Sequence, residues 1–208
     1  MPQTIGSTEL TQMLRTAAAR IRQNHEMLSR LDSFGGDGDH GTTMLRAMTI
    51  LEKTLEKPAG DPKTLLTDIG WAVMGVDGGA TGPLFGTFFT GMADPAAEAI
   101  DAGILAAMFE AGLLAVQGLT KARPGDKTMI DALVPAVEAV RAAAEAGDSI
   151  TQALDKAALA AEQGADATKN MKATFGRAKN IGEKSIGNPD PGATSVSLIF
   201  RGFSEGVR

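Results

Sequence analysis

The chain has 208 residues, of which 43% are hydrophobic and 4% aromatic, and its formal net charge is -5 at pH 7. It has no cysteine, which excludes disulfides and thiolate zinc sites, and the negative charge argues against a nucleic-acid groove, which usually needs a basic face. The length suits about one large domain, and we expect a single domain over residues 1–208 with no nucleic-acid partner.

The first predicted element is a helix over residues 7–30. The residues before it do not combine a basic start with an apolar block, so we expect no secretion signal and a cytoplasmic location. Ser7 can cap this helix, and Glu9 suits its first turn. Apolar residues at helical spacing then predict one buried face, formed by Leu10, Met13, Leu14, Ala17, Ala18, Ile21 and Leu28.

Two further helices follow a polar loop. The second is expected to start at Gly41 or Thr42 and to stop at Pro58 and Gly60. Its inward residues are predicted to be Met44, Leu45, Met48, Leu51 and Leu55. The third begins with Asp61-Pro62, an N-cap followed by proline at the first helical position. Its inward residues are predicted to be Leu65, Leu66, Ile69, Ala72, Val73 and Val76.

The middle of the chain continues the helical pattern. We expect a helix from Pro83 to about Met92, more helix over 96–119, and a helix over 128–146 in which Pro135 causes a kink or lies in the first turns. The most apolar stretch, 99–119, is interrupted by two acidic residues, three glycines and a glutamine. It is therefore too polar for a membrane span, and we expect no membrane partner.

The last third predicts two more helices. Ser149 can cap one that runs to about Asn170, and another begins at Gly192, although alternation of apolar residues over 196–200 also fits a strand. The pattern as a whole predicts an all-α domain of roughly eight helices. Glycine-rich polar loops at 32–43, 77–83, 123–129 and 176–192 separate these helices, and such loops suit the close approach of backbone to a ligand.

The loop FGGDGDHGTT, residues 34–43, carries the strongest chemical signal. Asp32, Asp37 and Asp39 lie within eight residues at a junction between two helices, and oxygen ligands of this kind suit Mg²⁺ or Ca²⁺. Mg²⁺ takes its other ligands from water and phosphates, and the N-terminus of the next helix offers N–H groups to phosphate oxygens. The alternative is a solvated, acidic helix cap.

Other motif matches are rejected. The segment GDGDHG fits G-x-G-x-x-G but follows a helical segment rather than a buried strand. An EF-hand beginning at Asp37 would place Met48 where glutamate is required. GDKT and GEKS lack the upstream glycine of a P-loop, and the two histidines have no zinc-site spacing. Lys127 is expected only to pair with Asp126 or Asp131.

The chain resembles the nucleotide-binding (L) subunit of dihydroxyacetone kinase, a domain also found at the C-terminus of single-chain dihydroxyacetone kinases. The resemblance rests on four motifs in order: LDSFGGDGDHGTTM, GGATGPLFGTFF, PGDKTMIDAL and GRAKNIGEKSIGNPDPGATS. It covers nearly the whole chain. It implies a closed barrel of eight antiparallel, amphipathic helices with the nucleotide at one end.

The resemblance also implies the residues of the site. Two Mg²⁺ ions would be held by residues matching Asp32, Asp37 and Asp39, and would bridge the phosphates of ADP or ATP. The residues that match the family's nucleotide contacts are His40, Gly41, Thr42, Thr43, Ala80, Thr81, Met129, Arg177, Asp190, Pro191 and Gly192.

In the family, a separate K-type subunit holds dihydroxyacetone, and in one branch a phosphotransferase-system protein rephosphorylates the bound ADP. The resemblance therefore implies a K-type partner and such a donor protein. A subunit that uses free ATP for another small sugar, a stand-alone dinuclear-metal phosphoesterase and a non-enzymatic regulator remain open as alternatives.

Overall fold

Helices make up most of residues 4–57 and 60–208, which are the residues described by the computed structural model. The α-helices are α1 (Ser7–Asp32), α2 (His40–Leu55), α3 (Pro62–Met74), α4 (Thr81–Ala93), α5 (Ala102–Leu119), α6 (Ile130–Glu145), α7 (Ile150–Ala167) and α8 (Pro191–Gly206). Two 3-10 segments, η1 (Thr168–Asn170) and η2 (Arg177–Ser185), lie between α7 and α8. The predicted all-α class is confirmed.

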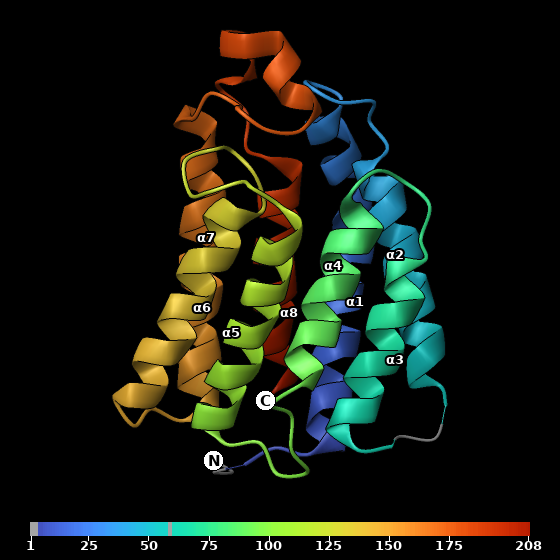
Figure 1. Cartoon of the computed structure of the whole chain (residues 1–208), viewed down its shortest axis with the longest axis vertical. Helices are drawn as coiled ribbons and strands as arrows, with labels where there is room; N and C mark the ends of the chain where they lie inside the picture. Colours follow the sequence, from blue (N-terminus) through green and yellow to red (C-terminus); the bar gives the residue numbers. More distant parts are fainter. Residues whose placement is uncertain (1–3, 58–59) are drawn as a thin grey trace.

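The eight helices alternate in direction and form a closed ring (Figure 1). Each helix contacts the next along the chain, and α8 returns to contact α1. Because the directions alternate, α2, α4, α6 and α8 all begin at the same end of the ring. The four glycine-rich loops are therefore gathered at that end, and both chain termini lie toward the other (Figure 1).

The apolar periodicity predicted the inward faces well. All seven apolar residues predicted for the first helix are buried in α1. Leu45 in α2 and Ala72 in α3 are only half-buried, whereas the other residues predicted to point inward from those two helices are buried. Side-chain caps act as expected at α3 and α7, where Asp61 and Ser149 accept N–H groups of the first turn.

Several predicted boundaries need correction. Ser7 is the first residue of α1 rather than its cap, and its hydroxyl donates instead to the carbonyl of Gly60, at 3.0 Å. Predicted helix over 96–101 is absent because Ile100 pairs in an isolated antiparallel bridge with Ile5, so that α5 begins only after Asp101 caps it. The expected stop at Pro58 lies outside the described residues.

Near the C-terminus, the strand alternative for residues 196–200 is wrong, because these residues lie within α8. The expected start of α6 at residue 128 is two residues early, and Pro135 lies inside that helix. The long connection over 176–192 is not wholly irregular, since it contains η2, which has a kink at Gly182.

Aromatic side chains fill the interior where α4, α5 and α8 meet. Phe109 of α5 lies between Phe88 of α4 and the α8 residues Phe200 and Phe203, with ring centroids 5.1–6.2 Å apart. Such tilted and offset pairs add packing energy beyond the area that they bury. This cluster holds together helices that are distant in the sequence, and so helps to close the ring.

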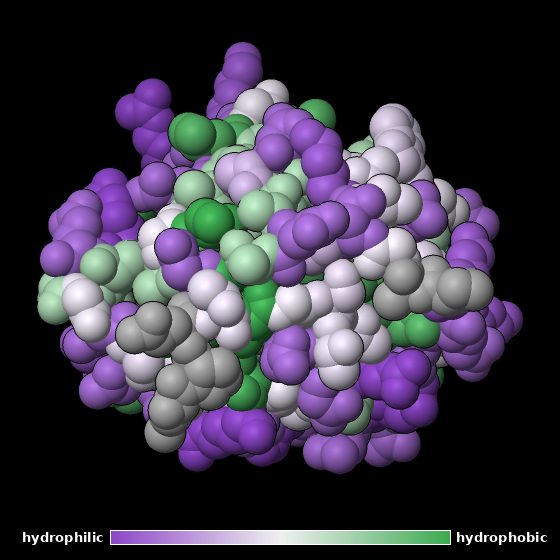
Figure 2. Space-filling view, turned by 90° about the horizontal axis from the view of Figure 1, so that it is seen from below, coloured by the Kyte–Doolittle hydropathy of each residue, from purple (hydrophilic) through white to green (hydrophobic). Residues whose placement is uncertain are grey.

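Helix α5 is the one described helix whose length and apolar composition would allow it to cross a membrane, with a mean hydropathy of 1.6 over Ala102–Leu119. The acidic residues, glycines and glutamine in this stretch therefore do not by themselves exclude a membrane span. In this fold α5 forms one wall of the ring between α4 and α6. The end of the ring opposite the glycine-rich loops presents mostly hydrophilic side chains, with small hydrophobic areas between them (Figure 2).

Candidate functional site

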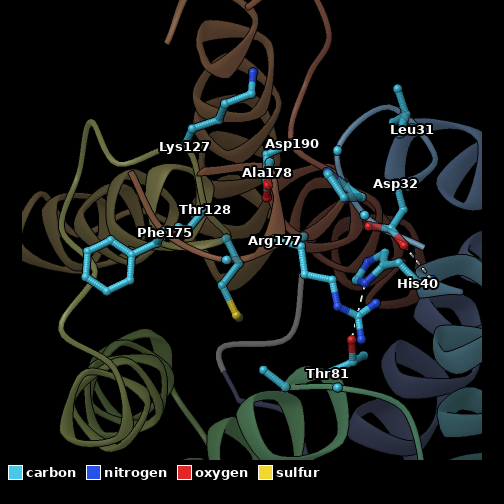
Figure 3. A pocket seen from close by; sticks show the side chains of 18 of the residues that line it. Leu31, Asp32, His40, Thr81, Lys127, Thr128, Phe175, Arg177, Ala178 and Asp190 are labelled. Carbon is cyan, nitrogen blue, oxygen red and sulfur yellow. Dashed lines mark hydrogen bonds between the residues drawn. The ribbon is translucent and has the colours of Figure 1, made fainter. Parts of the chain in front are cut away.

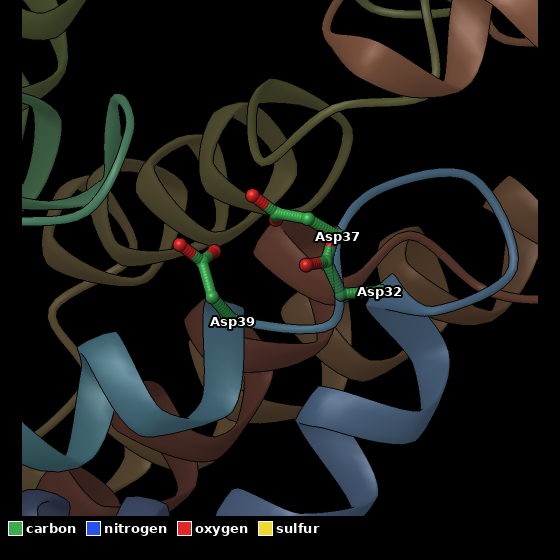
Figure 4. Close-up of side chains that lie close together, drawn as sticks. All are labelled: Asp32, Asp37 and Asp39. Carbon is green, nitrogen blue, oxygen red and sulfur yellow. The ribbon is translucent and has the colours of Figure 1, made fainter.

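The acidic loop joins the end of α1 to the start of α2. Asp32 is the last residue of α1 and Asp39 is the N-cap position of α2, so both helices hold the loop in place. Asp32, Asp37 and Asp39 each direct a carboxylate oxygen to a common region, with these oxygens all within 4.8 Å of one another (Figure 4). Three converging carboxylates repel one another, and their hardness and spacing fit a divalent cation such as Mg²⁺.

Arg177 supplies a positive charge to this cluster. It opens η2, and its guanidinium forms an ion pair with Asp37 and lies 3.9 Å from an oxygen of Asp39. Figure 3 shows the Arg177 side chain extending into the cavity toward His40 and Thr81. The 3-10 segment is thereby attached to the acidic loop through the same carboxylates that a cation would bind.

Removing the charge of Arg177 is expected to change the affinity of the acidic loop for a divalent cation. In an Arg177→Gln variant, the carboxylates lose a competing cation, so the affinity for Mn²⁺ alone is expected to rise two- to fivefold. Isothermal titration with Mn²⁺ in the absence of nucleotide measures this change, and Lys184→Gln in the same segment is the matched control. Weaker Mn²⁺ binding by Arg177→Gln would show that the arginine supports the metal site instead of competing with it.

His40 lies beside the acidic loop and is held through both ring nitrogens. Its Nε2 is 2.8 Å from the hydroxyl of Ser195 in α8, and its Nδ1 is 3.2 Å from the hydroxyl of Thr81 in α4. Burial lowers the pKa of His40, and the nearby charge of Asp32 partly opposes this shift. The ring is therefore neutral near pH 7 and links three helices. Sequence reasoning missed Ser195, which no local pattern connects to His40.

The second glycine-rich loop leads into α4 across the cavity from the acidic loop. Gly78 and Gly79 both have positive φ, at 132° and 56°, a region that side chains disfavour. Gly78 also lies directly over Thr43, since a Cβ at this position would be 2.3 Å from the threonine hydroxyl. This turn brings Ala80 and Thr81, at the start of α4, to the wall of the cavity.

Asp131 organises the loop over 123–129, which forms a third wall. Its carboxylate accepts the N–H groups of Gly125, at 2.5 Å, and Thr128, at 2.7 Å. The expectation that Lys127 pairs with Asp126 or Asp131 is wrong, because its ammonium donates to the carbonyls of Thr168 and Asn188. Met129 is buried and lines the cavity at the start of α6.

Asp190 caps α8, where its carboxylate accepts the N–H of Ala193 at 2.7 Å. Burial raises the pKa of Asp190 to about 7, and the Ala193 hydrogen bond and the charge of Lys127 oppose this rise. Burial also lowers the pKa of Lys127, opposed by the charges of Asp190 and Asp131. The start of α8 thus holds a carboxyl group that titrates near neutral pH.

An Asp190→Asn variant should reveal this titration. The ordinary pKa of the carboxyl is 3.8, so the folded protein binds the proton more tightly than the unfolded chain does. The contribution of the protonated Asp190 carboxyl to the free energy of unfolding is therefore complete below about pH 4 and is lost as the pH rises to about 7. Asparagine does not titrate and still offers an oxygen to Ala193. The variant should gain stability relative to the wild type as the pH rises from 5 to 7, by at most about 1.4 kcal/mol per pH unit.

Urea unfolding at pH 5, 6, 7 and 8 measures this difference. The depressed pKa of His40 acts in the opposite direction but is common to both proteins, so its effect cancels in the comparison. Asp61→Asn, at the exposed N-cap of α3, is the control. The pKa of Asp61 is lowered by hydrogen bonds from Thr64, so its loss should leave the pH dependence above pH 5 unchanged. A constant difference between Asp190→Asn and the wild type would contradict the assignment.

These walls enclose a cavity of about 400 Å³ at the end of the ring where the four even-numbered helices begin. Most residues predicted for the site line it, namely Asp32, Asp39, His40, Ala80, Thr81, Met129, Arg177, Asp190, Pro191 and Gly192. Asp37 is not among the lining residues, but it forms an ion pair with Arg177, which lines the cavity. Gly41 and Thr43 are buried in the first turn of α2, and Thr42 is exposed.

The cavity has both polar and apolar lining residues. Asp32, His40 and Thr81 lie together at one side, and Phe175 and Lys127 lie at the other (Figure 3). The apolar lining includes several residues that sequence reasoning did not select, among them Leu31, Phe34, Leu84, Phe85, Phe175 and Ile181. Four helix N-termini and a carboxylate cluster beside an apolar pocket suit a ligand with a metal-bound anionic end and a flat apolar end.

Known proteins are similar to this chain in sequence and in fold. A family model described as the DAK2 domain matches residues 35–205. The ADP-binding subunit DhaL of PEP-dependent dihydroxyacetone kinase 1 from Listeria innocua is 40% identical over 183 residues, which is 87% of each chain. The corresponding DhaL subunit from Escherichia coli is 38% identical over 200 residues, which is 95% of each chain.

Longer relatives contain a region similar to this chain. Human triokinase/FMN cyclase is 36% identical over 201 residues, which cover 96% of this chain and 35% of the human protein. The crystal structure of the dihydroxyacetone kinase of C. freundii superposes with a TM-score of 0.76 at 27% identity, covering 99% of this chain and 35% of that one. A second structure of that kinase, in complex with AMP-PNP and Mg²⁺, gives a TM-score of 0.75.

The all-α ring and the relatives that share it define the class of this protein, which is a kinase subunit. Within that class, the chain belongs to the DAK2 domain family. Both the fold and the family expected from the four sequence motifs are confirmed.

Proposed function

We propose that this chain is the ADP- and ATP-binding subunit of a kinase for dihydroxyacetone or a related small ketose or triose. The observation that carries the proposal is the convergence of Asp32, Asp37 and Asp39 beside the N-terminus of α2, with carboxylate oxygens within 4.8 Å of one another. Relatives named as ADP-binding subunits, and a similar kinase solved with AMP-PNP and Mg²⁺, support the same ligand.

In this proposal the three aspartates hold two Mg²⁺ ions, which neutralise the charge of the nucleotide phosphates when bound. The phosphates lie near the N-termini of α2 and α4, whose free N–H groups favour anions. The base lies in the apolar part of the cavity beside Met129. The remaining nucleotide contacts come from His40, Gly41, Thr42, Thr43, Ala80, Thr81, Arg177, Asp190, Pro191 and Gly192.

The residues of the chain would serve mainly to position reactants and to stabilise charge, because phosphoryl transfer requires little covalent chemistry from the protein. His40 is neutral and both of its ring nitrogens meet hydroxyls, those of Ser195 and Thr81, so its single N–H would contact a phosphate oxygen only in place of one of these hydroxyls. Arg177, which pairs with Asp37 at the acidic loop, would add a positive charge close to the phosphates of a nucleotide held there. We propose that residues 1–208 act as one domain in these roles.

We further propose that a separate K-type subunit holds the sugar and that the complex acts in the cytoplasm. This chain spans 35% of the C. freundii kinase that it resembles, so the larger part of that enzyme has no counterpart within these 208 residues. Relatives of similar length are named as subunits of PEP-dependent or PTS-dependent kinases. We therefore favour retained ADP that a phosphotransferase-system protein rephosphorylates.

Four measurements test the proposal. Isothermal titration of the purified chain should show ADP binding that depends on Mg²⁺, and mass spectrometry should detect adenine nucleotide that co-purifies. Phosphorylation of dihydroxyacetone should require an added K-type subunit. Metal-dependent hydrolysis of p-nitrophenyl phosphate by the chain alone would favour a phosphoesterase instead, and ADP binding unaffected by Mg²⁺ would reject the metal site.

A further inference from the structure

Lys127 has an unusual backbone conformation. Among the residues that the structure describes, it is the one non-glycine residue with positive φ, at 62°. A non-glycine residue in this region is strained, and the conformation persists only where the surrounding contacts over-determine it. Lys127 follows Gly125, which also has positive φ, so the loop turns sharply just before α6. The contacts made by the lysine side chain account for this turn.

The ammonium group of Lys127 joins segments that are far apart in the sequence. Its Nζ donates to the carbonyl of Thr168, directly after α7, and to the carbonyl of Asn188, just before α8, both at 2.5 Å. The hydroxyl of Thr168 in turn accepts the N–H of Asp190, at 2.8 Å. One side chain therefore ties the loop before α6 to the end of α7 and to the turn that leads into α8.

This arrangement is costly for stability alone. Lys127 is 5% exposed, and a buried ammonium group loses much of its hydration energy. The nearby acids do not form a direct ion pair with it among the described residues, because Asp131 is occupied by the loop N–H groups and Asp190 by the start of α8. A methionine would fill a similar volume without the desolvation cost of an ammonium group. We therefore attribute the ammonium group of Lys127 to the geometry that it imposes on the loops rather than to a gain in stability.

Two of the three segments joined by Lys127 border the cavity, namely the loop before α6 and the turn before α8. Thr128 and Met129 follow it directly, and Asn188 leads into Asp190, Pro191 and Gly192 at the start of α8. Lys127 and Asp190 lie on the same side of the cavity, away from Asp32 and Thr81 (Figure 3). A shift of the 188–192 turn would move the first N–H groups of α8 relative to any ligand held by the acidic loop opposite.

We propose that Lys127 is a positioning residue for the nucleotide: by binding the carbonyls of Thr168 and Asn188, its ammonium group fixes the turn that starts α8 against the loop that starts α6. The proposal deepens the function proposed above and depends on it for the identity of the ligand. The position of the turn itself can be tested without any ligand.

The first experiment is hydrogen exchange of the free protein, measured by mass spectrometry. A Lys127→Met variant is expected to exchange the amides of residues 188–194 at least tenfold faster than the wild type, with exchange in α2 and α3 unchanged. Lys121→Met, which removes an exposed lysine from the same loop, is the control and should behave as the wild type. Unchanged exchange over 188–194 in Lys127→Met would overturn the proposal.

A further pair of variants covers the case in which Lys127→Met does not fold, as judged by circular dichroism. Lys127→Arg keeps a cationic donor, whereas Lys127→Gln offers a shorter, neutral one. The arginine variant should protect residues 188–194 better than the glutamine variant. Equal exchange in the two would overturn the proposal, because it would show that the cation does not hold the turn.

The second experiment measures ligand binding and activity. Lys127→Met should weaken Mg–ADP binding about tenfold, and in an assay with a K-type subunit and a phosphotransferase-system donor it should raise KM for ADP with little change in kcat. Partial recovery in Lys127→Arg is expected. A fall in kcat with unchanged KM would overturn the positioning role. If the wild-type chain binds no nucleotide, the proposed function fails, whereas the exchange experiment still decides whether Lys127 fixes the turn.

Discussion

Replacing Asp37 and Asp39 together by asparagine is expected to lower the affinity for Mg–ADP at least a hundredfold. In the folded chain these carboxylates and Asp32 converge within 4.8 Å, and two of the three negative charges that would hold the metal disappear in the variant. Each lost charge–charge contact at a partly exposed site is worth about 1–2 kcal/mol or more, so two of them reach the hundredfold range. Isothermal titration with ADP at fixed Mg²⁺ measures the loss.

The same variant should keep its fold. The acidic loop lies outside the hydrophobic core. Relief of repulsion between the carboxylates and loss of the Arg177–Asp37 ion pair act in opposite directions, so the free energy of unfolding of the metal-free protein is expected to change by less than about 1 kcal/mol. Asp68→Asn, an exposed carboxylate on α3 away from the cavity, is the matched control and should bind Mg–ADP normally. Full affinity in the double variant would show that the nucleotide binds without this cluster.

A Gly202→Ala substitution is expected to destabilise the ring strongly, because the added methyl group would collide with the backbone of α1. A Cβ at this position would lie 2.3 Å from Cα and 2.6 Å from N of Ala17, which are backbone atoms of α1 that cannot move without shifting the helix. Overpacking of this kind costs about 2–3 kcal/mol. For a chain of this size, the melting temperature should fall by roughly 5–10 °C, as measured by calorimetry or circular dichroism.

Gly118→Ala provides the control for this substitution. Gly118 lies in α5, and a Cβ there would meet no atom within 4 Å. The added methyl group should stabilise the helix by up to about 0.5–1 kcal/mol, because alanine has the higher helix propensity. If Gly202→Ala were as stable as Gly118→Ala, the close contact between α1 and α8 that closes the ring would be absent in solution.

Local features of the sequence were sufficient to predict most of the secondary structure. Apolar residues at helical spacing identified the buried faces, because a helix brings residues three and four apart onto one side. Short-range caps such as Asp61 and Ser149 marked helix starts correctly. The failures occurred where a distant segment intervened: the backbone bridge from Ile5 held residues near Ile100 out of a helix that their composition favoured.

The acidic cluster could be recognised from the sequence for the same reason. Asp32, Asp37 and Asp39 are close in the chain, so one short loop between two helices is enough to bring them together. The cavity opposite could not be assembled in this way. Its walls come from segments that are far apart in the sequence: the contacts of His40 with Thr81 and Ser195 span 41 and 155 residues. No local pattern in the sequence indicates which loops meet at the same end of the closed ring.

The sequence by itself therefore determined the helices, their apolar faces and the acidic loop with its three aspartates. All of these depend on residues that are close to one another in the chain. Only the tertiary structure decided that Arg177 lies against Asp37 and that Lys127 bonds the carbonyl of Asn188. These contacts exist because eight alternating helices bring four loops to one end of a closed ring. Contacts that form only when the ring closes join residues far apart in the sequence, so no periodic or local pattern predicts them.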